Sequence, residues 1–335
     1  MRQTEKFLLQ LGDYHILNIN GKEATSSQIY SLWSFMNMLP HAVSKNIFAR
    51  GESDKNLRKH YLTDTTNISL LLDTIFCIGE KGRVCLDDNN WIDPDDITAK
   101  NFTRICTLLR SVLESADKGS PGRVERMREF IRRNTSFHKA FTNDINNVVS
   151  NYTRLSSQKR AAVNIYYLSI LHTINSYSYK DQSIFVSTSQ DFEIAEQFEQ
   201  TLLLIGWIPT QPKYVSVDAK RTDIYRSICD SVGLPYSTEP AYPEQAEISV
   251  RYGILPHFII GAKVKNEFYV NPALYETMNL FSECRTIKEM RNLRRDIFSH
   301  GLKVNQDRFL DYCQDTNYRR FFTYDGNEYR INSVD

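Results

Sequence analysis

Three consecutive hydroxyl side chains at the end of an apolar segment are the first feature of this chain that could take part in chemistry. The apolar residues 184–186 lead directly into Ser187, Thr188 and Ser189. This pattern predicts a strand that ends in the hydroxyls, followed by a helix over 191–198 with its apolar residues on one face. The hydroxyls could line a site, or they could cap the helix that follows.

A second segment carries an amide and a carboxylate two residues apart. Gln245 and Glu247 follow Pro243 and precede the apolar residues 248–250. We expect a turn that leads into a strand, with both side chains on the same face because strand side chains alternate. A fixed carboxylate stabilises positive charge that develops in a transition state, so Glu247 is the candidate catalytic group. Glu244, next to Gln245, would face the opposite way. It is the alternative to Gln245 if the register of the strand is shifted by one residue.

Together these segments resemble the ADP-ribosyltransferase superfamily, in the branch that has an arginine, a Ser-Thr-Ser strand and a Gln-x-Glu or Glu-x-Glu strand. The resemblance covers roughly residues 184–274. It implies an α+β fold with a mixed, mainly antiparallel split β-sheet core and additional helical segments. It also implies that NAD is the substrate, with positive charge developing on the ribose as nicotinamide leaves.

The resemblance assigns roles to these side chains. Glu247 would hold the ribose and support the cationic transition state, and Ser187 would orient Glu247. Thr188 and Ser189 would support the strand and the nicotinamide pocket. Gln245 would lie near the acceptor, since in the resembling families a Gln here goes with asparagine or nucleobase acceptors and a Glu with arginine. The alternatives are an exposed strand Glu and a solvated strand Gln.

Two further side chains are candidates for binding. Tyr242, in the loop before Glu247, would stack on a base or simply pack. Arg50, followed by Gly51, fits the family's first-strand arginine, whose guanidinium suits a phosphate. It precedes Ser187 by 137 positions, so an inserted helical unit would have to separate them.

Two histidines are further candidates. His172 would bind NAD in place of the arginine, as a histidine does in the poly-ADP-ribose-polymerase-like branch, or it would be a partly buried structural histidine. His257 would be a turn or packing residue, or border the cleft.

Length and composition set the frame for these motifs. The chain has 335 residues, with 41 basic against 40 acidic, so its bulk charge indicates no partner. Its six cysteines are scattered without a Cys-x-x-Cys pair, which favours reduced buried thiols over a metal site. The beginning of the sequence lacks the apolar run of a signal peptide, and no stretch is long enough to cross a membrane. We therefore expect a cytoplasmic protein without a metal.

The pattern of apolar residues and breaks predicts three regions. They are a largely helical region 1–155 that contributes the first NAD-binding strand, a transferase core 156–274, and a helical extension 275–335 that ends in a hairpin. The Gly- and Pro-containing run 118–122 is the strongest break, and an arginine-bearing helix should follow it. Further predicted elements are an amphipathic helix over 157–177, a central strand over 201–208, a helix over 223–232 ended by Gly233, and an antiparallel meander over 248–250, 254–261 and 268–270. The periodicity of the apolar residues does not decide whether segments 7–17 and 70–78 form strands or helices.

The main functional interpretation is a mono-ADP-ribosyltransferase. It would be a toxin or anti-phage defence effector, similar to those of toxin-antitoxin systems. Its partners would be a macromolecular acceptor and an antitoxin protein. Nucleic acid is favoured over protein as the acceptor, because Gln245 and the arginines after Gly122 suit bases and phosphates. The arginines are Arg123, Arg126, Arg128, Arg132 and Arg133. Their alternative is a solvated helix face. The competing functions are a noncatalytic binding module with the same NAD fold and an NAD glycohydrolase that uses water.

Overall fold

The structure, a computed structural model, contains both helices and strands in the α+β manner. It describes residues 11–42, 46–80, 92–174, 179, 182–198, 201–208, 216–219, 222–272, 274, 286, 320–324 and 329–333. Eight strands belong to a mainly antiparallel sheet, and two more form a hairpin. The coarse fold class predicted from the sequence is therefore correct.

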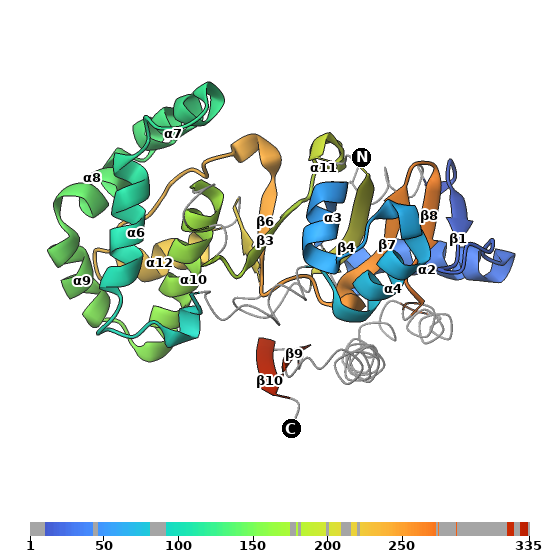
Figure 1. Ribbon diagram of the computed structural model, residues 1–335. Helices are drawn as coiled ribbons and strands as arrows, with labels where there is room; N and C mark the ends of the chain where they lie inside the picture. The colour runs from blue at the N-terminus through green and yellow to red at the C-terminus, as the bar shows by residue number, and fades with distance from the viewer. Residues whose placement is uncertain are drawn as a thin grey trace. The chain divides into compact units, whose positions relative to one another are not determined.

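The chain divides into two compact units (Figure 1). The sheet unit comprises Met1–Asp88, Thr188–Val215 and Val250–Asp335, and the helical unit comprises Asn89–Ser187 and Ser216–Ser249. These limits differ from the predicted boundaries at 155 and 274. The reason is that strands far apart in the sequence assemble together, so the chain passes from one unit to the other within a strand.

The sheet unit is built around one long apolar strand. Its strands are β1 (His15–Leu17), β2 (Asn46–Glu52), β4 (Leu202–Ile208), β7 (Ile259–Val264) and β8 (Glu267–Val270), in the order β1-β8-β7-β4-β2. As predicted, β4 is central, because it pairs antiparallel with both β2 and β7. Residues 202–207 are all buried, which explains their unbroken apolar run.

The predicted antiparallel meander is only half correct. β7 and β8 do form an antiparallel hairpin through Val264 and Glu267. The other edge of β7 is occupied by β4, so the strand over 248–250, which is part of β6 (Glu247–Arg251), is not its neighbour. The long apolar β4 competes successfully for the edge of β7 because it offers more buried side chains to pair with.

Helices accompany the sheet unit's strands. They are α2 (Ser26–Ala42), α3 (Asp54–Tyr61), α4 (Ile68–Ile78) and α11 (Phe192–Phe198). Segment 70–78, for which the sequence allowed either a strand or a helix, is thus helical. The N-cap of α4 is Asn67, whose side chain accepts from the amide of Leu70. In segment 7–17, which was also undecided, the last three residues form β1, and residues 7–10 lie outside the described residues. The helix predicted over 191–198 is present, but Phe198 is exposed instead of sharing the buried face.

The helical unit surrounds one buried helix. Its helices are α6 (Thr103–Glu114), α7 (Pro121–Arg133), α8 (Thr135–Asn143), α9 (Ile145–Thr153), α10 (Ser157–Ile174) and α12 (Asp223–Asp230). α10 matches the predicted helix, but residues 162–169 are buried on every side, so it is not amphipathic. Buried Asn164 is satisfied there, because its amide accepts from the hydroxyl of Tyr152 at 2.8 Å and donates to two backbone carbonyls.

Other predicted elements of the helical unit are also present. α7 begins directly after the 118–122 break, with Pro121 at its first turn. α12 is followed by Gly233, whose φ of +73° is the left-handed value that the predicted stop requires. The first residues of β3 (Phe185–Ser189) and β6, together with β5 (Ser216–Asp218), complete the unit in the order β3-β6-β5.

The remaining predictions concern the C-terminal region and the surface. β9 (Arg320–Tyr324) and β10 (Tyr329–Ser333) pair antiparallel as the predicted hairpin, whereas most of the helical extension lies outside the described residues.

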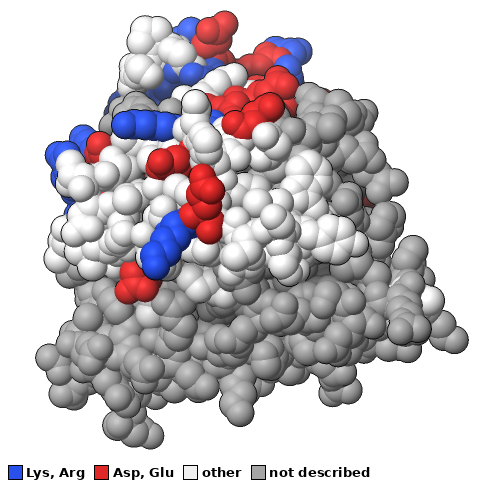
Figure 2. Space-filling view, turned by 90° about the vertical axis from the view of Figure 1, so that its right-hand side faces the viewer, with Lys and Arg blue, Asp and Glu red and all other residues white. Residues whose placement is uncertain are grey.

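On the face in Figure 2, acidic and basic side chains lie interspersed. In the part of the chain that the structure describes, no helix is long and apolar enough to span a membrane.

Gly206, in the middle of β4, provides a test of the sheet unit's packing. A Cβ atom there would lie 2.5 Å from both the carbonyl oxygen of Phe258 and the ring of Phe48. We expect Gly206→Ala to lower the free energy of unfolding by roughly 1–3 kcal/mol, since the close-packed neighbours must move. Urea unfolding followed by circular dichroism measures the change.

Gly122→Ala is the matched control, because its Cβ would meet only the flexible end of Arg126, at 3.3 Å. In helix α7 this change should be neutral or stabilise by at most about 1 kcal/mol. Equal unfolding midpoints for both variants would contradict the tight packing of β4.

Candidate functional site

His172 connects the buried helix to the hydroxyl strand. It lies near the end of α10, half-buried, with its Nε2 atom 2.8 Å from the Oγ atom of Ser187 on β3. Its Nδ1 atom is 2.8 Å from the Oγ atom of Ser183. A neutral imidazole has one donor and one acceptor nitrogen, so the two serines fix its orientation and it fixes theirs. The structure thus brings together two predicted site residues, Ser187 and His172, within the helical unit.

Ser189 takes part in the turn that begins α11, within the sheet unit. Its buried hydroxyl accepts from the amide of Asp191 at 2.9 Å. The carboxylate of Asp191 in turn accepts from the amides of Glu193 and Ile194 in the first turn of α11. Asp191 thus caps α11, and Ser189 stabilises the turn before it, while Thr188 is buried beside Ser189.

Glu247 is a buried carboxylate at the first position of β6. Its side chain is 6% exposed and accepts a hydrogen bond from the hydroxyl of Ser249 at 2.9 Å. The two residues are two apart on one strand, so their side chains share a face. β6 neighbours β3, the strand of Ser187. The interpretation of Glu247 as an exposed strand residue is therefore wrong.

Gln245 does not lie on the strand of Glu247. It ends a short 3₁₀ helix, η4 (Pro243–Gln245), and Ala246 follows in the left-handed conformation with φ of 45°. The prediction that Gln245 and Glu247 share a strand face is therefore wrong, because the strand begins only at Glu247. A left-handed L residue costs about 1 kcal/mol or more, so this turn is maintained by its surroundings.

The loop before η4 is held by one buried amide, that of Asn134 between α7 and α8. Its Oδ1 atom accepts from the backbone amides of Thr238 at 2.8 Å and Glu239 at 3.2 Å. Its Nδ2 atom donates to the carbonyl oxygens of Glu239 and Phe130, each at 3.0 Å. The hydroxyl of Thr238 also donates to Oδ1. We call this set of bonds the Asn134 clamp.

Two tyrosines of α10 hold the same loop from the other side. The hydroxyl of Tyr166 donates to the carbonyl oxygen of Ser237 at 3.2 Å and accepts from its amide at 3.0 Å. The hydroxyl of Tyr167 donates to the carbonyl oxygen of Pro235 at 2.7 Å. A loop without regular secondary structure thus has its backbone groups paired with buried side chains.

Tyr242 lies under an arginine of α7. The Cζ atom of Arg126 is 5.3 Å from the centre of the half-buried Tyr242 ring, which is cation–π geometry. Burial raises the pKa of Tyr242, Arg126 opposes this effect, and the Glu247 carboxylate adds to it. Tyr242 is therefore within electrostatic range of Glu247.

Three other arginines of α7 have acidic partners, and Arg123 has a backbone partner. Arg128 pairs with Asp117 at 2.8 Å, and Arg132 pairs with Glu129 at 2.6 Å. Arg133 pairs with Glu129 and, at 3.0 Å, with Glu239 of the clamped loop, while Arg123 donates to the carbonyl oxygen of Lys118. Exposed ion pairs contribute only about 0–1 kcal/mol, so phosphates can compete for these arginines.

Arg50 lies on β2 of the sheet unit, beside the strand of the hydroxyls. The preceding residue, Ala49, pairs with Ser189 of β3, so these two strands are neighbours. The guanidinium forms ion pairs with two buried carboxylates, those of Glu52 and, through Nε at 3.4 Å, Glu80. The hydroxyl of Tyr61 also donates to Glu80.

These neighbours determine the protonation of the Arg50 cluster. Burial acts to lower the pKa of Arg50, but the Glu52 and Glu80 carboxylates outweigh it, so the pKa is raised. Burial raises the pKa of Glu52, although Arg50 acts in the opposite direction. A phosphate that binds Arg50 would have to compete with two buried carboxylates.

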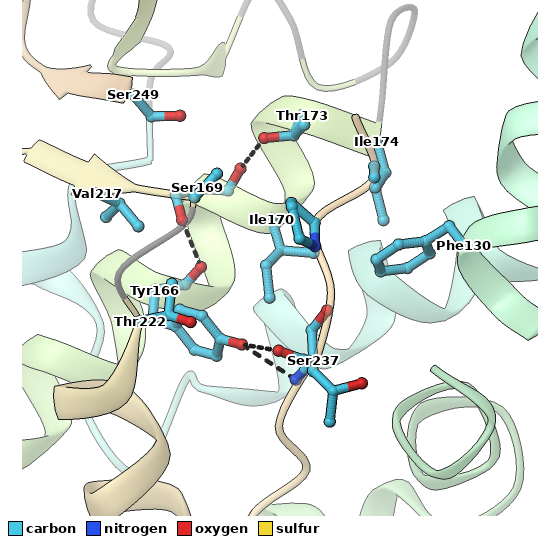
Figure 3. A pocket seen from close by; sticks show the side chains of 14 residues that line it. Phe130, Tyr166, Ser169, Ile170, Thr173, Ile174, Val217, Thr222, Ser237 and Ser249 are labelled. Atoms are coloured by element: carbon cyan, nitrogen blue, oxygen red, sulfur yellow. Dashed lines mark hydrogen bonds between the residues drawn. The ribbon is translucent and has the colours of Figure 1, made fainter. Parts of the chain in front are cut away.

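A pocket lies in the helical unit next to Ser249 (Figure 3). α10 supplies Ser169, Ile170 and Thr173, and the clamped loop 237–241 forms another wall. Its volume is about 470 Å³, including the part open to solvent. We call it the hydroxyl pocket, because Ser and Thr side chains supply much of its lining.

Sequence reasoning missed several residues that position this site. Ser249 had a signal, since it lies two residues after Glu247 and so shares its strand face. Ser183 and Asn134 had none, because their partners are defined only by the packing of α10 and α7. The side chain of His257 lies outside the described residues, and among those described no group of His, Cys, Asp and Glu could hold a metal ion.

Comparison with protein-family models, with curated proteins and with solved structures found no match.

The Asn134 clamp can be tested by Asn134→Ala. We expect faster hydrogen exchange at the amides of Thr238 and Glu239, because both lose their acceptor, and a loss of roughly 1–3 kcal/mol in the free energy of unfolding. Hydrogen exchange followed by mass spectrometry or NMR measures the first effect. Asn147→Ala, at an exposed position of α9, should change neither quantity. Unchanged exchange at Thr238 and Glu239 in Asn134→Ala would show that the clamp does not hold the loop.

Proposed function

We propose that this protein is a mono-ADP-ribosyltransferase that transfers ADP-ribose from NAD to a macromolecule. The observation that carries the proposal is the placement of Ser187 and Glu247 on adjacent strands, β3 and β6. It is the placement that the resemblance to the ADP-ribosyltransferase superfamily calls for.

The chemistry of each group suits this reaction. As nicotinamide leaves, positive charge develops on the ribose, and the fixed carboxylate of Glu247 would stabilise it. The hydroxyl of Ser249 donates to the Glu247 carboxylate and so orients it for this role. Ser187, held by His172, would position the sugar or the carboxylate. Preorganised groups of this kind lower the barrier because they need not reorient during the reaction.

A second candidate function is a noncatalytic binding module on the same fold. It is favoured by the ion pairs of Arg50 with Glu52 and Glu80, which compete with NAD phosphates. Incubation with labelled NAD and separate pools of RNA, DNA and protein separates the functions. Label in a polymer supports transfer, and nicotinamide release without label supports a glycohydrolase. The absence of both label and nicotinamide release supports a binding module.

The acceptor that we favour is nucleic acid. Tyr242 offers a ring and Gln245 offers an amide for a base edge, both in the segment just before Glu247. Arg128 and Arg132 project from α7 with 68% and 71% of their side chains exposed, so they are available to phosphates. A role as a toxin or anti-phage effector with an antitoxin partner follows from the resemblance and belongs to this proposal.

Glu247→Gln tests the catalytic assignment. We expect transfer from NAD to fall by at least about 10²–10³-fold, because a neutral amide of the same shape cannot offset the developing charge. Circular dichroism should show an unchanged fold. Ser187→Ala should lose less, since it removes a hydrogen bond and not a charge.

Glu244→Gln is the matched control, because Glu244 is an exposed carboxylate three residues earlier. It should retain activity. A folded Glu247→Gln variant with most of its activity would overturn the catalytic role of Glu247.

The acceptor is tested by the double variant Arg128→Ala, Arg132→Ala. Transfer to nucleic acid should weaken and its salt dependence should decrease by about one unit of log–log slope per lost phosphate contact. NAD hydrolysis without acceptor should stay unchanged, because these side chains take no part in nicotinamide release. Gln245→Ala should likewise reduce transfer more than hydrolysis.

Arg58→Ala, Arg226→Ala is the control, since it removes two equally exposed charges elsewhere, with side chains 63% and 60% exposed. Equal effects of the two double variants would indicate bulk charge instead of a phosphate contact. Label that appears only on protein and survives nuclease treatment would refute nucleic acid as the acceptor and leave the transferase proposal standing.

A further inference from the structure

We propose that the hydroxyl pocket binds a neutral nucleobase that carries an exocyclic amino group. Charge is the first constraint. All fourteen lining residues are uncharged, and they include Phe130, Ile170, Ile174 and Val217 (Figure 3). A charged group of either sign would lose its hydration there without a lining residue of opposite charge, so we infer a neutral ligand.

The lining hydroxyls determine which hydrogen bonds a ligand can make. Six lining residues carry Ser or Thr hydroxyls: Ser169, Thr173, Thr222, Ser237, Thr238 and Ser249. Ser169 donates to the carbonyl oxygen of Tyr166 at 2.8 Å, and Thr173 donates to that of Ser169 at 2.9 Å.

The other hydroxyls are engaged in the same way. Ser237 donates to the carbonyl oxygen of Glu239 at 2.9 Å, Thr238 donates to Asn134, and Ser249 donates to Glu247. Thr222 shares a hydrogen bond with the hydroxyl of Tyr236. A hydroxyl whose hydrogen is engaged keeps lone pairs that accept. The pocket therefore offers acceptors, and its ligand must supply N–H donors.

Shape and position narrow the ligand further. The apolar part of the lining suits the faces of a flat ring. An aromatic ring with an amino group combines apolar faces with N–H donors at its edge. Adenine and cytosine have this chemistry.

The pocket wall next to β6 couples the ligand to Glu247. Ser249 lines the pocket and donates to the Glu247 carboxylate, so the two are separated by one side chain. The opposite wall, loop 237–241, is held by the Asn134 clamp, so the pocket keeps its form. Binding of a base requires neither NAD nor transfer, and this inference therefore stands if the transferase proposal fails.

The test measures the binding of free bases to the full chain in the absence of NAD, by calorimetry or ligand-observed NMR. Adenine and cytosine should bind, and their analogues without the amino group, purine and pyrimidin-2-one, should bind roughly tenfold more weakly, the effect of one lost hydrogen bond. Displacement of the bound base by a short single-stranded oligonucleotide would identify a polymer base as the source, and displacement by a free nucleotide alone would identify the base of a nucleotide. Equal binding of bases and analogues, or no binding of either base at millimolar concentration, would overturn the proposal.

A matched pair of variants locates the binding. Thr173→Val removes a pocket hydroxyl at constant shape and should weaken adenine or cytosine binding roughly tenfold, while Thr173→Ser should retain it. Thr142→Val removes the same kind of hydroxyl, which donates to the carbonyl oxygen of His138 at 2.9 Å, from another half-buried helical position outside the pocket. It should leave binding unchanged. An equal loss in both valine variants would place the ligand elsewhere. If Thr173→Val does not fold, the comparison of bases and analogues on the natural chain decides.

Discussion

The buried amide of Asn134 is the interaction on which the proposed site depends. The loop that it holds has no regular secondary structure before η4, so its backbone N–H groups must find partners elsewhere. Asn134 supplies an acceptor for two successive amides and a donor for a carbonyl oxygen. The path of the loop then decides where Tyr242 lies, where β6 begins and how the hydroxyl pocket is closed. A buried amide with all its bonds satisfied rigidifies a structure, and one left unsatisfied would destabilise it.

The two groups of buried carboxylates have different environments. Glu247, in the helical unit, is met by a neutral hydroxyl from Ser249. Glu52 and Glu80, in the sheet unit, are met by the guanidinium of Arg50. A hydroxyl that donates to a carboxylate orients it, whereas a guanidinium between two carboxylates holds both as ion pairs. The catalytic role that we propose for Glu247 rests on its position on β6, beside the strand of Ser187.

Helix α7 serves two purposes through different arginines. Arg126 and Arg133 contact the clamped loop, one through the ring of Tyr242 and the other through Glu239. Arg128 and Arg132 project outward and pair only weakly with surface carboxylates. The same basic helix can thus support the loop from one side and present charge to a polymer from the other.

The sequence by itself determined the elements whose patterns are local. The apolar run of β4, the Gly- and Pro-marked start of α7, the length of α10 and the hairpin of β9 and β10 all follow from composition over a few residues. The carboxylate Glu247 and the hydroxyl run at Ser187 could be identified for the same reason, since their residue types and neighbours mark them.

Only the tertiary structure decided how these elements combine. β6 does not pair with β7 because β4 takes that edge, and α10 is buried all round because other helices cover its polar side. Gln245 lies outside the strand, in a turn that follows a loop held by Asn134, more than a hundred residues earlier in the chain. Residue periodicity reports local geometry, whereas strand partners and buried hydrogen bonds depend on contacts between segments that are distant in the sequence.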